Sequence, residues 1–200
     1  MRTAYCFDLD GTVTTLEILP CIAAELGIVE EIATLTRLTM DGRIPFADSL
    51  RLRALILGQV PVSRVHDIIN AVPLEPSLLR FISNHSDNSF VVTGNINVWV
   101  EPLLQRLGCR WFCSEAIQEN GRLSLVRILD KGVALHRLRN EGKFQRIVAV
   151  GDGANDVSML NSADIGIAYG GVHPPTPATI AAADLIIHDP DSLCMLLKAL

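Results

Sequence analysis

Two carboxylates, Asp8 and Asp10, stand one residue apart near the start of the chain, after the apolar residues 4–7 and before Gly11. A short apolar run that ends at a glycine is typical of a buried strand. Alternate strand residues point to the same side, so extended geometry would place both carboxylates on one face. Two like charges that close need a cation or a shared proton. The pair predicts acid–base or metal chemistry; the alternative is a strand that ends in a polar turn.

A second acidic stretch lies far downstream, where residues 151–156 read Gly-Asp-Gly-Ala-Asn-Asp after the apolar run 147–150. The flanking glycines allow the backbone to turn sharply beside Asp152. Asp152 and Asp156 could join Asp8 in an all-oxygen cluster, which suits a hard cation such as Mg²⁺. The alternative is a glycine turn followed by a helix start. That alternative explains each residue singly, but not two acidic strand ends in one chain.

The segments around these motifs alternate between strand-like and helix-like patterns. This alternation predicts an α/β, Rossmann-like fold: a mainly parallel sheet with helices on both faces. Ligands of such sheets bind at the carboxyl ends of the strands, where both acidic stretches would lie. Asn-Gly at 120–121 predicts a tight hairpin. The expected strands are 4–7, 89–92, 110–113, 147–150, 164–169 and 185–187, and the expected core helices include 76–84, 98–107 and 130–140.

Residues 13–74 contain helical patterns alone and predict a small all-helical cap inserted after the first strand. The core domain would then comprise residues 1–12 and 75–200. Thr14, Thr15 or both are expected to cap the first helix of this insertion. On the helix expected over 45–57, Arg53 shares a face with apolar residues. Either Arg53 extends to the rim of that face, or it points into a closed pocket and binds an anion.

Composition narrows the class of protein. The chain has 200 residues, 49% of them apolar, a net charge of −5 and no basic run, which argues against nucleic acid or an anionic membrane as a partner. Uninterrupted apolar runs are shorter than the roughly 18 residues of a membrane span, so we expect a cytoplasmic protein. Its five scattered cysteines are expected to be free thiols in a reducing compartment. Oligomeric state stays open.

Four ordered motifs carry a resemblance to a known family. They are Asp8-Leu9-Asp10-Gly11-Thr12, Thr93-Gly94-Asn95, Lys131 and the run 151–156. Together they resemble the motifs of the haloacid-dehalogenase-like (HAD) phosphatase superfamily, over nearly the whole chain. Within it the chain is most similar to phosphoserine phosphatases, because Glu17 is followed by Met-x-Gly-x-x-x-Phe-x-x-Ser-Leu-x-x-Arg over residues 40–53.

The resemblance implies a Mg²⁺-dependent phosphomonoester hydrolase with an aspartyl-phosphate intermediate and phosphoserine as its small-molecule substrate. Asp8 would be the nucleophile and Asp10 the general acid and base. Mg²⁺ would be held by Asp8, Asp152 and the main-chain carbonyl of Asp10, with Asp156 in support. The remaining roles that the resemblance implies are phosphate binding by Thr93, Gly94 and Lys131, and substrate binding by Glu17, Met40, Phe46, Arg53 and Asn155.

Other functions share parts of this pattern. A phosphatase or phosphotransferase acting on another small phosphate monoester remains an alternative. Two-component receiver domains carry a phosphorylated Asp, but they lack an acid two residues later and are too short for a helical insertion. The chain departs from phosphoserine phosphatases at Asn95, where they usually have Gly, and in the loop 170–177, which lacks their Lys. These departures bear on the identity of the substrate more than on the class of reaction.

Overall fold

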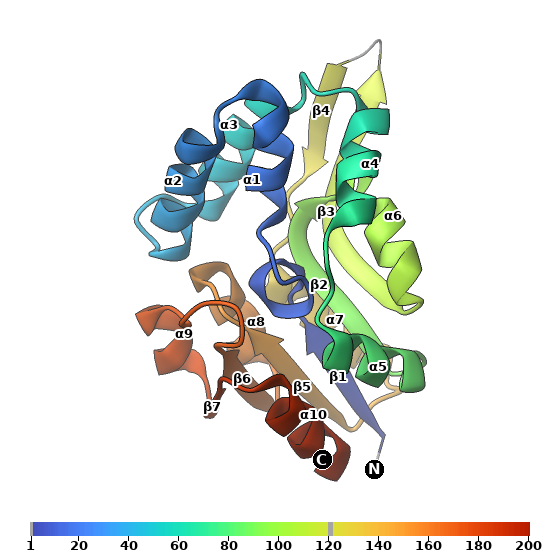
Figure 1. The fold of residues 1–200 in the computed structure, drawn as a ribbon. Coiled ribbons are helices and arrows are strands. Elements are labelled where there is room, and N and C mark those ends of the chain that lie inside the picture. The colour runs from blue at the N-terminus through green and yellow to red at the C-terminus, as the bar shows by residue number, and fades with distance from the viewer. Residues whose placement is uncertain (1, 120–121) are drawn as a thin grey trace.

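A seven-stranded sheet with the order β4-β3-β2-β1-β5-β6-β7 forms the centre of the computed structural model, which describes residues 2–119 and 122–200 (Figure 1). Neighbouring strands are parallel except β3 and β4, which pair antiparallel. The predicted α/β, mainly parallel sheet is therefore confirmed. The strands are β1 (Thr3–Phe7), β2 (Ser89–Ile96), β3 (Arg110–Glu119), β4 (Arg122–Arg127), β5 (Arg146–Gly151), β6 (Ile165–Tyr169) and β7 (Leu185–Ile187).

Helices cover both faces of the sheet, because its central strands are apolar on both sides. Tyr5 and Phe7 of β1 lie in one core with α5 (Pro76–Asn84), α6 (Asn97–Leu107) and α10 (Pro190–Ala199). Ala4 and Cys6 point the other way. The core on that side includes residues of α7 (Lys131–Asn140) and α8 (Val157–Ser162), with Ala182 of α9 (Pro177–Ala182) packed against it.

The helical insertion consists of α1 (Ile18–Ala23), α2 (Val29–Met40), α3 (Phe46–Leu57) and α4 (Val62–Ala71). The chain enters and leaves it side by side, because Thr14 and Leu74 form an antiparallel bridge. Figure 1 shows α1, α2 and α3 grouped at one end of the sheet, while α4 packs along α6. The insertion after the first strand is thus present, and its boundaries as a separate cap domain stay a prediction.

The connection from β1 into this insertion differs from the expected extended chain. Residues Leu9–Val13 form a wide, irregular helical turn, within which Gly11 has a φ of 71°, a conformation that favours glycine. The predicted helix cap by Thr14 or Thr15 is wrong, since α1 begins after Glu17 without a side-chain cap. The Thr14 hydroxyl instead lies within hydrogen-bond distance of the carbonyls of Leu9 and Leu16, and its one proton can be donated to either of them.

The register of the three central strands brings their ends to one edge of the sheet. Phe7 pairs with Val91 of β2 and with Val150 of β5. Asp8, Thr93 and Asp152 follow these residues directly or within two positions, so all three lie at the same edge. This edge faces the helical insertion.

One predicted strand end differs from the structure, and one predicted turn lies outside the residues that the structure describes. Strand β3 continues to Glu119, six residues beyond its predicted end at 113, because it pairs with β4 in a hairpin. The predicted turn at 120–121 lies outside the described residues. The five cysteines are free. Within residues 2–119 and 122–200, no helix is long and apolar enough to cross a membrane.

Candidate active site

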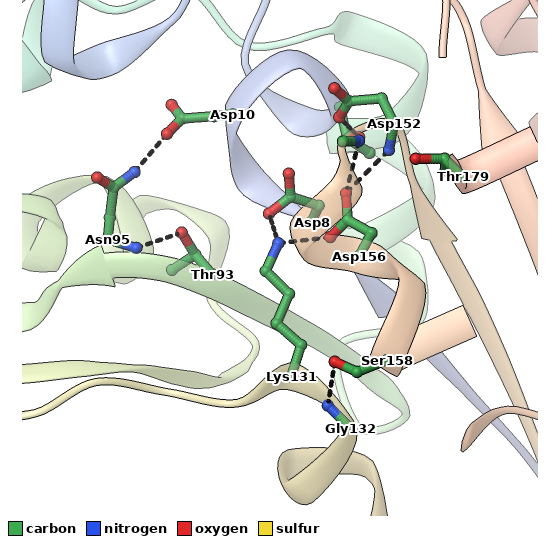
Figure 2. A network of polar contacts seen from close by, with 12 residues as sticks. Asp8, Asp10, Thr93, Asn95, Lys131, Gly132, Asp152, Asp156, Ser158 and Thr179 are labelled. Carbon is green, nitrogen blue, oxygen red and sulfur yellow. Dashed lines mark hydrogen bonds and ion pairs between the residues drawn. The ribbon is translucent and has the colours of Figure 1, made fainter. Parts of the chain in front are cut away.

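Three buried carboxylates meet at the carboxyl edge of the central strands. Asp8 follows β1, Asp152 follows β5, and Asp156 ends the short helical turn Ala154–Asp156. Each contributes an oxygen within 4.8 Å of the others. Lys131, the first residue of α7, places its Nζ 2.5 Å from Asp8 Oδ1 and 2.5 Å from Asp156 Oδ1 (Figure 2). One ammonium against three carboxylates leaves an excess of negative charge.

Burial and mutual repulsion dominate the acid–base properties of this cluster. Burial and the charge of Asp156 together raise the pKa of Asp8 to about 7, against the opposing effect of Lys131. Burial, together with the charges of Asp156 and Asp8, also raises the pKa of Asp152. Burial would lower the pKa of Lys131, but Asp156 and Asp8 outweigh it and raise that pKa. A bound divalent cation would relieve the repulsion that these shifts express.

The loop after β5 is built around Asp156. Its Oδ2 accepts the backbone N–H groups of Asp152 and Gly153, both at 3.0 Å. A Cβ on Gly151 would lie 2.5 Å from the Asp156 carboxyl carbon, so only glycine allows this approach. Asp156 therefore orients Asp152 as well as carrying charge.

Asp152 has one oxygen engaged and one available. Its Oδ1 accepts the Thr12 hydroxyl at 3.0 Å. Its Oδ2 is buried and finds no hydrogen-bond donor among the residues that the structure describes, while the His173 ring nitrogen Nε2 lies 3.3 Å away. Unsatisfied buried oxygens are rare in proteins. This oxygen, the excess charge and the all-carboxylate donor set fit a hard metal ion.

Asp10 lies outside the carboxylate cluster. Its Oδ1 accepts the backbone N–H of Ile18 at 3.1 Å, and its Oδ2 accepts the side-chain amide of Asn95. Figure 2 shows its carboxylate turned toward Asn95 and away from Lys131. Burial and the charges of Glu17 and Asp8 raise the pKa of Asp10 well above its ordinary value, although the bonds from Ile18 and Asn95 oppose this. A carboxyl with a raised pKa can act as a general acid.

Asp8, Asp10 and Asp152 border one small cavity of about 50 Å³ beneath the helical insertion. The predicted substrate and phosphate residues other than Lys131 are brought together in its lining: Glu17, Met40, Phe46, Arg53, Thr93, Gly94 and Asn155. Lys131 lies with the acidic cluster instead. The volume is far below the roughly 300–1,000 Å³ of typical ligand clefts. The space beneath the insertion is therefore small for a ligand in this structure.

Arg53 is buried rather than extended to the rim, with 4% of its surface exposed. Its Nη1 donates to the Thr36 hydroxyl at 3.2 Å and its Nε to the Ser49 carbonyl at 3.4 Å. Within residues 2–119 and 122–200 no carboxylate forms an ion pair with it. Burial lowers the pKa of Arg53, and the charges of Asp10 and Glu17 oppose the shift. A buried guanidinium with only neutral partners is suited to an anionic ligand group.

Phe46 closes the cavity against the end of β2. A Cβ added to Gly94 would lie 2.2 Å from the tip of the Phe46 ring, so this contact requires glycine. Next to it, the Thr93 hydroxyl accepts the backbone N–H of Asn95 at 3.1 Å. An aromatic ring thus covers the strand end that carries the predicted phosphate-binding residues.

Two contacts of this site had no signal in the sequence. Asn95 stands out there only as a departure from a motif, and its bond to Asp10 spans 85 positions. His173 belongs to a proline-rich loop without a motif, yet its Nε2 lies 3.1 Å from Glu17 Oε1, 156 positions away. Pairings at such separations arise from the tertiary fold.

A mainly parallel sheet with a buried acidic cluster at the carboxyl ends of its central strands, covered by a helical insertion, places this protein in the class of α/β proteins whose site suits a metal ion. Residues 6–161 match the family of haloacid dehalogenase-like hydrolases, and the chain belongs to that family. The relatives and solved structures that the chain resembles confirm the prediction of a phosphoric monoester hydrolase.

These relatives are phosphoserine phosphatases. The chain is 31% identical to phosphoserine phosphatase from Methanocaldococcus jannaschii over 175 residues, which cover 82% of this chain and 83% of that protein. Some other matched phosphoserine phosphatases are longer, and the chain spans 51% and 47% of two of them. A substrate-bound phosphoserine phosphatase superposes with a TM-score of 0.86 at 28% identity, covering all of this chain and 98% of that one. A phospho-aspartyl intermediate analogue of phosphoserine phosphatase gives 0.85 at the same identity, with the same coverage of both chains.

Proposed function

We propose that the protein hydrolyses O-phosphoserine to serine and inorganic phosphate, in a Mg²⁺-dependent reaction through an aspartyl-phosphate on Asp8. In the cell this reaction would serve serine biosynthesis in the cytoplasm. The observation that carries the substrate assignment is Arg53, a buried cation with neutral partners in the same cavity as Asp8 and Asp10. The similarity to phosphoserine phosphatases supports it.

In the first half-reaction an oxygen of Asp8 attacks phosphorus in line with the ester bond. Lys131 holds Oδ1 of this carboxylate, which leaves its second oxygen for the attack. The bond from phosphorus to the serine oxygen breaks, and Asp10 donates its proton to that oxygen. The raised pKa of Asp10 favours the protonated form that this step needs.

In the second half-reaction water attacks the phosphoryl group on Asp8. Asp10, now ionised, takes the proton of the water, and the bond from phosphorus to Asp8 breaks. Its hydrogen bonds from Ile18 and Asn95 stabilise the ionised form. The burial of Asp10 therefore favours its neutral form, and its hydrogen bonds stabilise its charged form. A group that acts first as general acid and then as general base needs both forms.

Mg²⁺ would be held by Asp8, Asp152 and the main-chain carbonyl of Asp10, with Asp156 in support. It would supply positive charge to the phosphoryl oxygens and to Asp8. The Thr93 hydroxyl, the Gly94 backbone N–H and the Lys131 ammonium would bind the phosphoryl group.

The rest of the cavity would recognise the serine part of the substrate. Arg53 would bind the carboxylate through its forked donors, and Glu17 would bind the ammonium. Met40 and Phe46 would exclude water, and Asn155 would line the same pocket. Because the cavity is smaller than typical ligand clefts, α2 and α3 would move outward to admit the substrate.

Arg53→Ala tests the substrate assignment. It should lower kcat/KM for phosphoserine about 10²–10³-fold, because a substrate carboxylate then loses its partner in a buried site. Phosphoethanolamine lacks the carboxylate, so its kcat/KM should change little. Steady-state kinetics with both compounds measure the difference.

Arg51→Ala is the matched control, because Arg51 lies two positions away on the same helix with a largely exposed side chain. It should leave both substrates unaffected. The assignment fails if Arg53→Ala lowers hydrolysis of both compounds equally, or if the parent protein does not prefer phosphoserine.

Asp152→Ala tests the metal site. Removing a carboxylate ligand should raise the Mg²⁺ concentration for half-maximal activity about tenfold or more. It should also reduce the rise in melting temperature that Mg²⁺ gives the parent protein, since a bound ligand stabilises the folded state. Asp87→Ala, at an exposed position, is the control. Identical Mg²⁺ titrations for the parent and Asp152→Ala would show that Asp152 is not a ligand.

A further inference from the structure

His173 connects the loop after β6 to the helical insertion. Its Nε2 lies 3.1 Å from Glu17 Oε1 and 3.3 Å from Asp152 Oδ2. Glu17 immediately precedes α1, so the contact joins the core to the residue from which the helical insertion begins its first helix. Since a carboxylate can only accept, the ring nitrogen donates to Glu17.

Gly11 leaves room for the imidazole ring of His173. A Cβ on Gly11 would lie 2.6 Å from His173 Nε2 and 3.2 Å from Asp152 Oδ2. Gly11 also has the positive φ that favours glycine. The turn after Asp8 therefore leaves the space that the imidazole fills between Glu17 and Asp152.

This contact changes the charges that the cavity offers to a ligand. Glu17, the proposed partner of a substrate ammonium, already has the imidazole at hydrogen-bond distance. Arg53 has the hydroxyl of Thr36 and the carbonyl of Ser49 as partners, both neutral. The free charge that the substrate end of the cavity presents is thus the guanidinium, and the carboxylate of Glu17 is engaged.

We propose that His173 is a positioning residue that sets substrate specificity by holding the Glu17 carboxylate in competition with a substrate ammonium. The site then selects phosphate monoesters that carry a carboxylate, and the amino group adds little to their binding. This proposal deepens the proposed function and relies on it for the placement of the substrate next to Glu17 and Arg53.

The competition has a simple energetic consequence. A substrate ammonium gains its contact with Glu17 only if the imidazole gives up its own. The side chains of His173 and Glu17 are partly exposed, by 28% and 26%. Pairs of this exposure contribute little net free energy, so exchanging one for the other gains almost nothing. Removing the imidazole should therefore improve the binding of amino-bearing ligands alone.

A matched pair of ligands isolates this effect: O-phosphoserine and 3-phosphonooxypropanoate, which is the same molecule without the amino group. Each competes with p-nitrophenyl phosphate hydrolysis at saturating Mg²⁺, and the inhibition constants give their relative affinities. In the parent protein these constants should differ by less than about tenfold. In His173→Ala the preference for phosphoserine should rise about three- to tenfold, while the constant for 3-phosphonooxypropanoate stays within about twofold.

Three further variants separate specificity from a merely structural role. His173→Gln keeps a donor near Glu17 and should restore part of the parent's weak preference. In a Glu17→Gln background, His173→Ala should no longer change the ratio of the inhibition constants of the two ligands. His136→Ala, at an exposed position on α7, should leave it unchanged.

An unchanged ratio in His173→Ala, or equal weakening of both ligands, would overturn the proposal. These outcomes are distinct from failure of the proposed function, which would appear as absent or unselective hydrolysis of phosphoserine by the parent protein while the inhibition constants can still be measured. Failure of both ligands to compete in the parent would overturn both proposals.

Discussion

Asp8→Asn should reduce phosphomonoester hydrolysis by about 10⁴–10⁶-fold, as expected when an enzyme loses its covalent nucleophile. The amide matches the carboxylate in shape, but its oxygen is a poor nucleophile and forms no acyl phosphate. The fold should persist, because the change removes one of three like charges buried around Lys131. The measurements are kcat with phosphoserine and with p-nitrophenyl phosphate, together with the melting temperature.

The control for Asp8→Asn is the same substitution at the exposed Asp87, which should leave activity unchanged. Mass spectrometry of acid-quenched parent enzyme should find phosphate on the peptide that contains Asp8, and none on that peptide in the variant. Substantial turnover by a folded Asp8→Asn protein would contradict the covalent mechanism.

Asp10→Asn should slow hydrolysis of phosphoserine by about 10²–10⁴-fold, the usual contribution of a general acid–base group. Asparagine can still accept the N–H of Ile18, so the turn that carries residue 10 should remain in place. The loss in kcat/KM, which reports only the phosphorylation of Asp8, should be much smaller for p-nitrophenyl phosphate, whose leaving group needs little protonation. Phosphoenzyme should accumulate with this substrate, because attack by water still needs a base.

The comparison of the two leaving groups provides the internal control for Asp10. A general defect in folding or metal binding would slow both substrates alike. Equal losses in kcat/KM with phosphoserine and p-nitrophenyl phosphate would therefore show that Asp10 is not the acid.

The sequence predicted the carboxylate cluster because local patterns and one general rule were enough. Apolar runs before Asp8 and Asp152 indicated buried strands, and parallel strands present their carboxyl ends at one edge. The structure adds that β1 and β5 are direct neighbours. Helix α5 has its predicted bounds because Pro76 fits a first helical turn and a capping side chain, Glu75, precedes it.

The sequence could not decide between interpretations that depend on tertiary packing. Arg53 shares a helix face with apolar residues in either case, and its burial depends on Thr36 from α2, 17 positions away. The contacts Asn95–Asp10 and His173–Glu17 join segments that only the sheet brings together. Strand β3 is longer than predicted because its pairing with β4 stabilises residues after 113 as strand. The alternation of apolar and polar residues there is too weak to predict a strand by itself.

The most direct test of the proposed function is kcat/KM of the parent protein, with Mg²⁺, for phosphoserine, phosphothreonine, phosphoethanolamine, sugar phosphates and nucleotides. The site geometry predicts that phosphoserine has the highest value. It also predicts that phosphoethanolamine, which cannot engage Arg53, falls about 10²-fold or more below it. A higher value for a compound without a carboxylate would contradict the account of the substrate site and leave a phosphatase of different specificity.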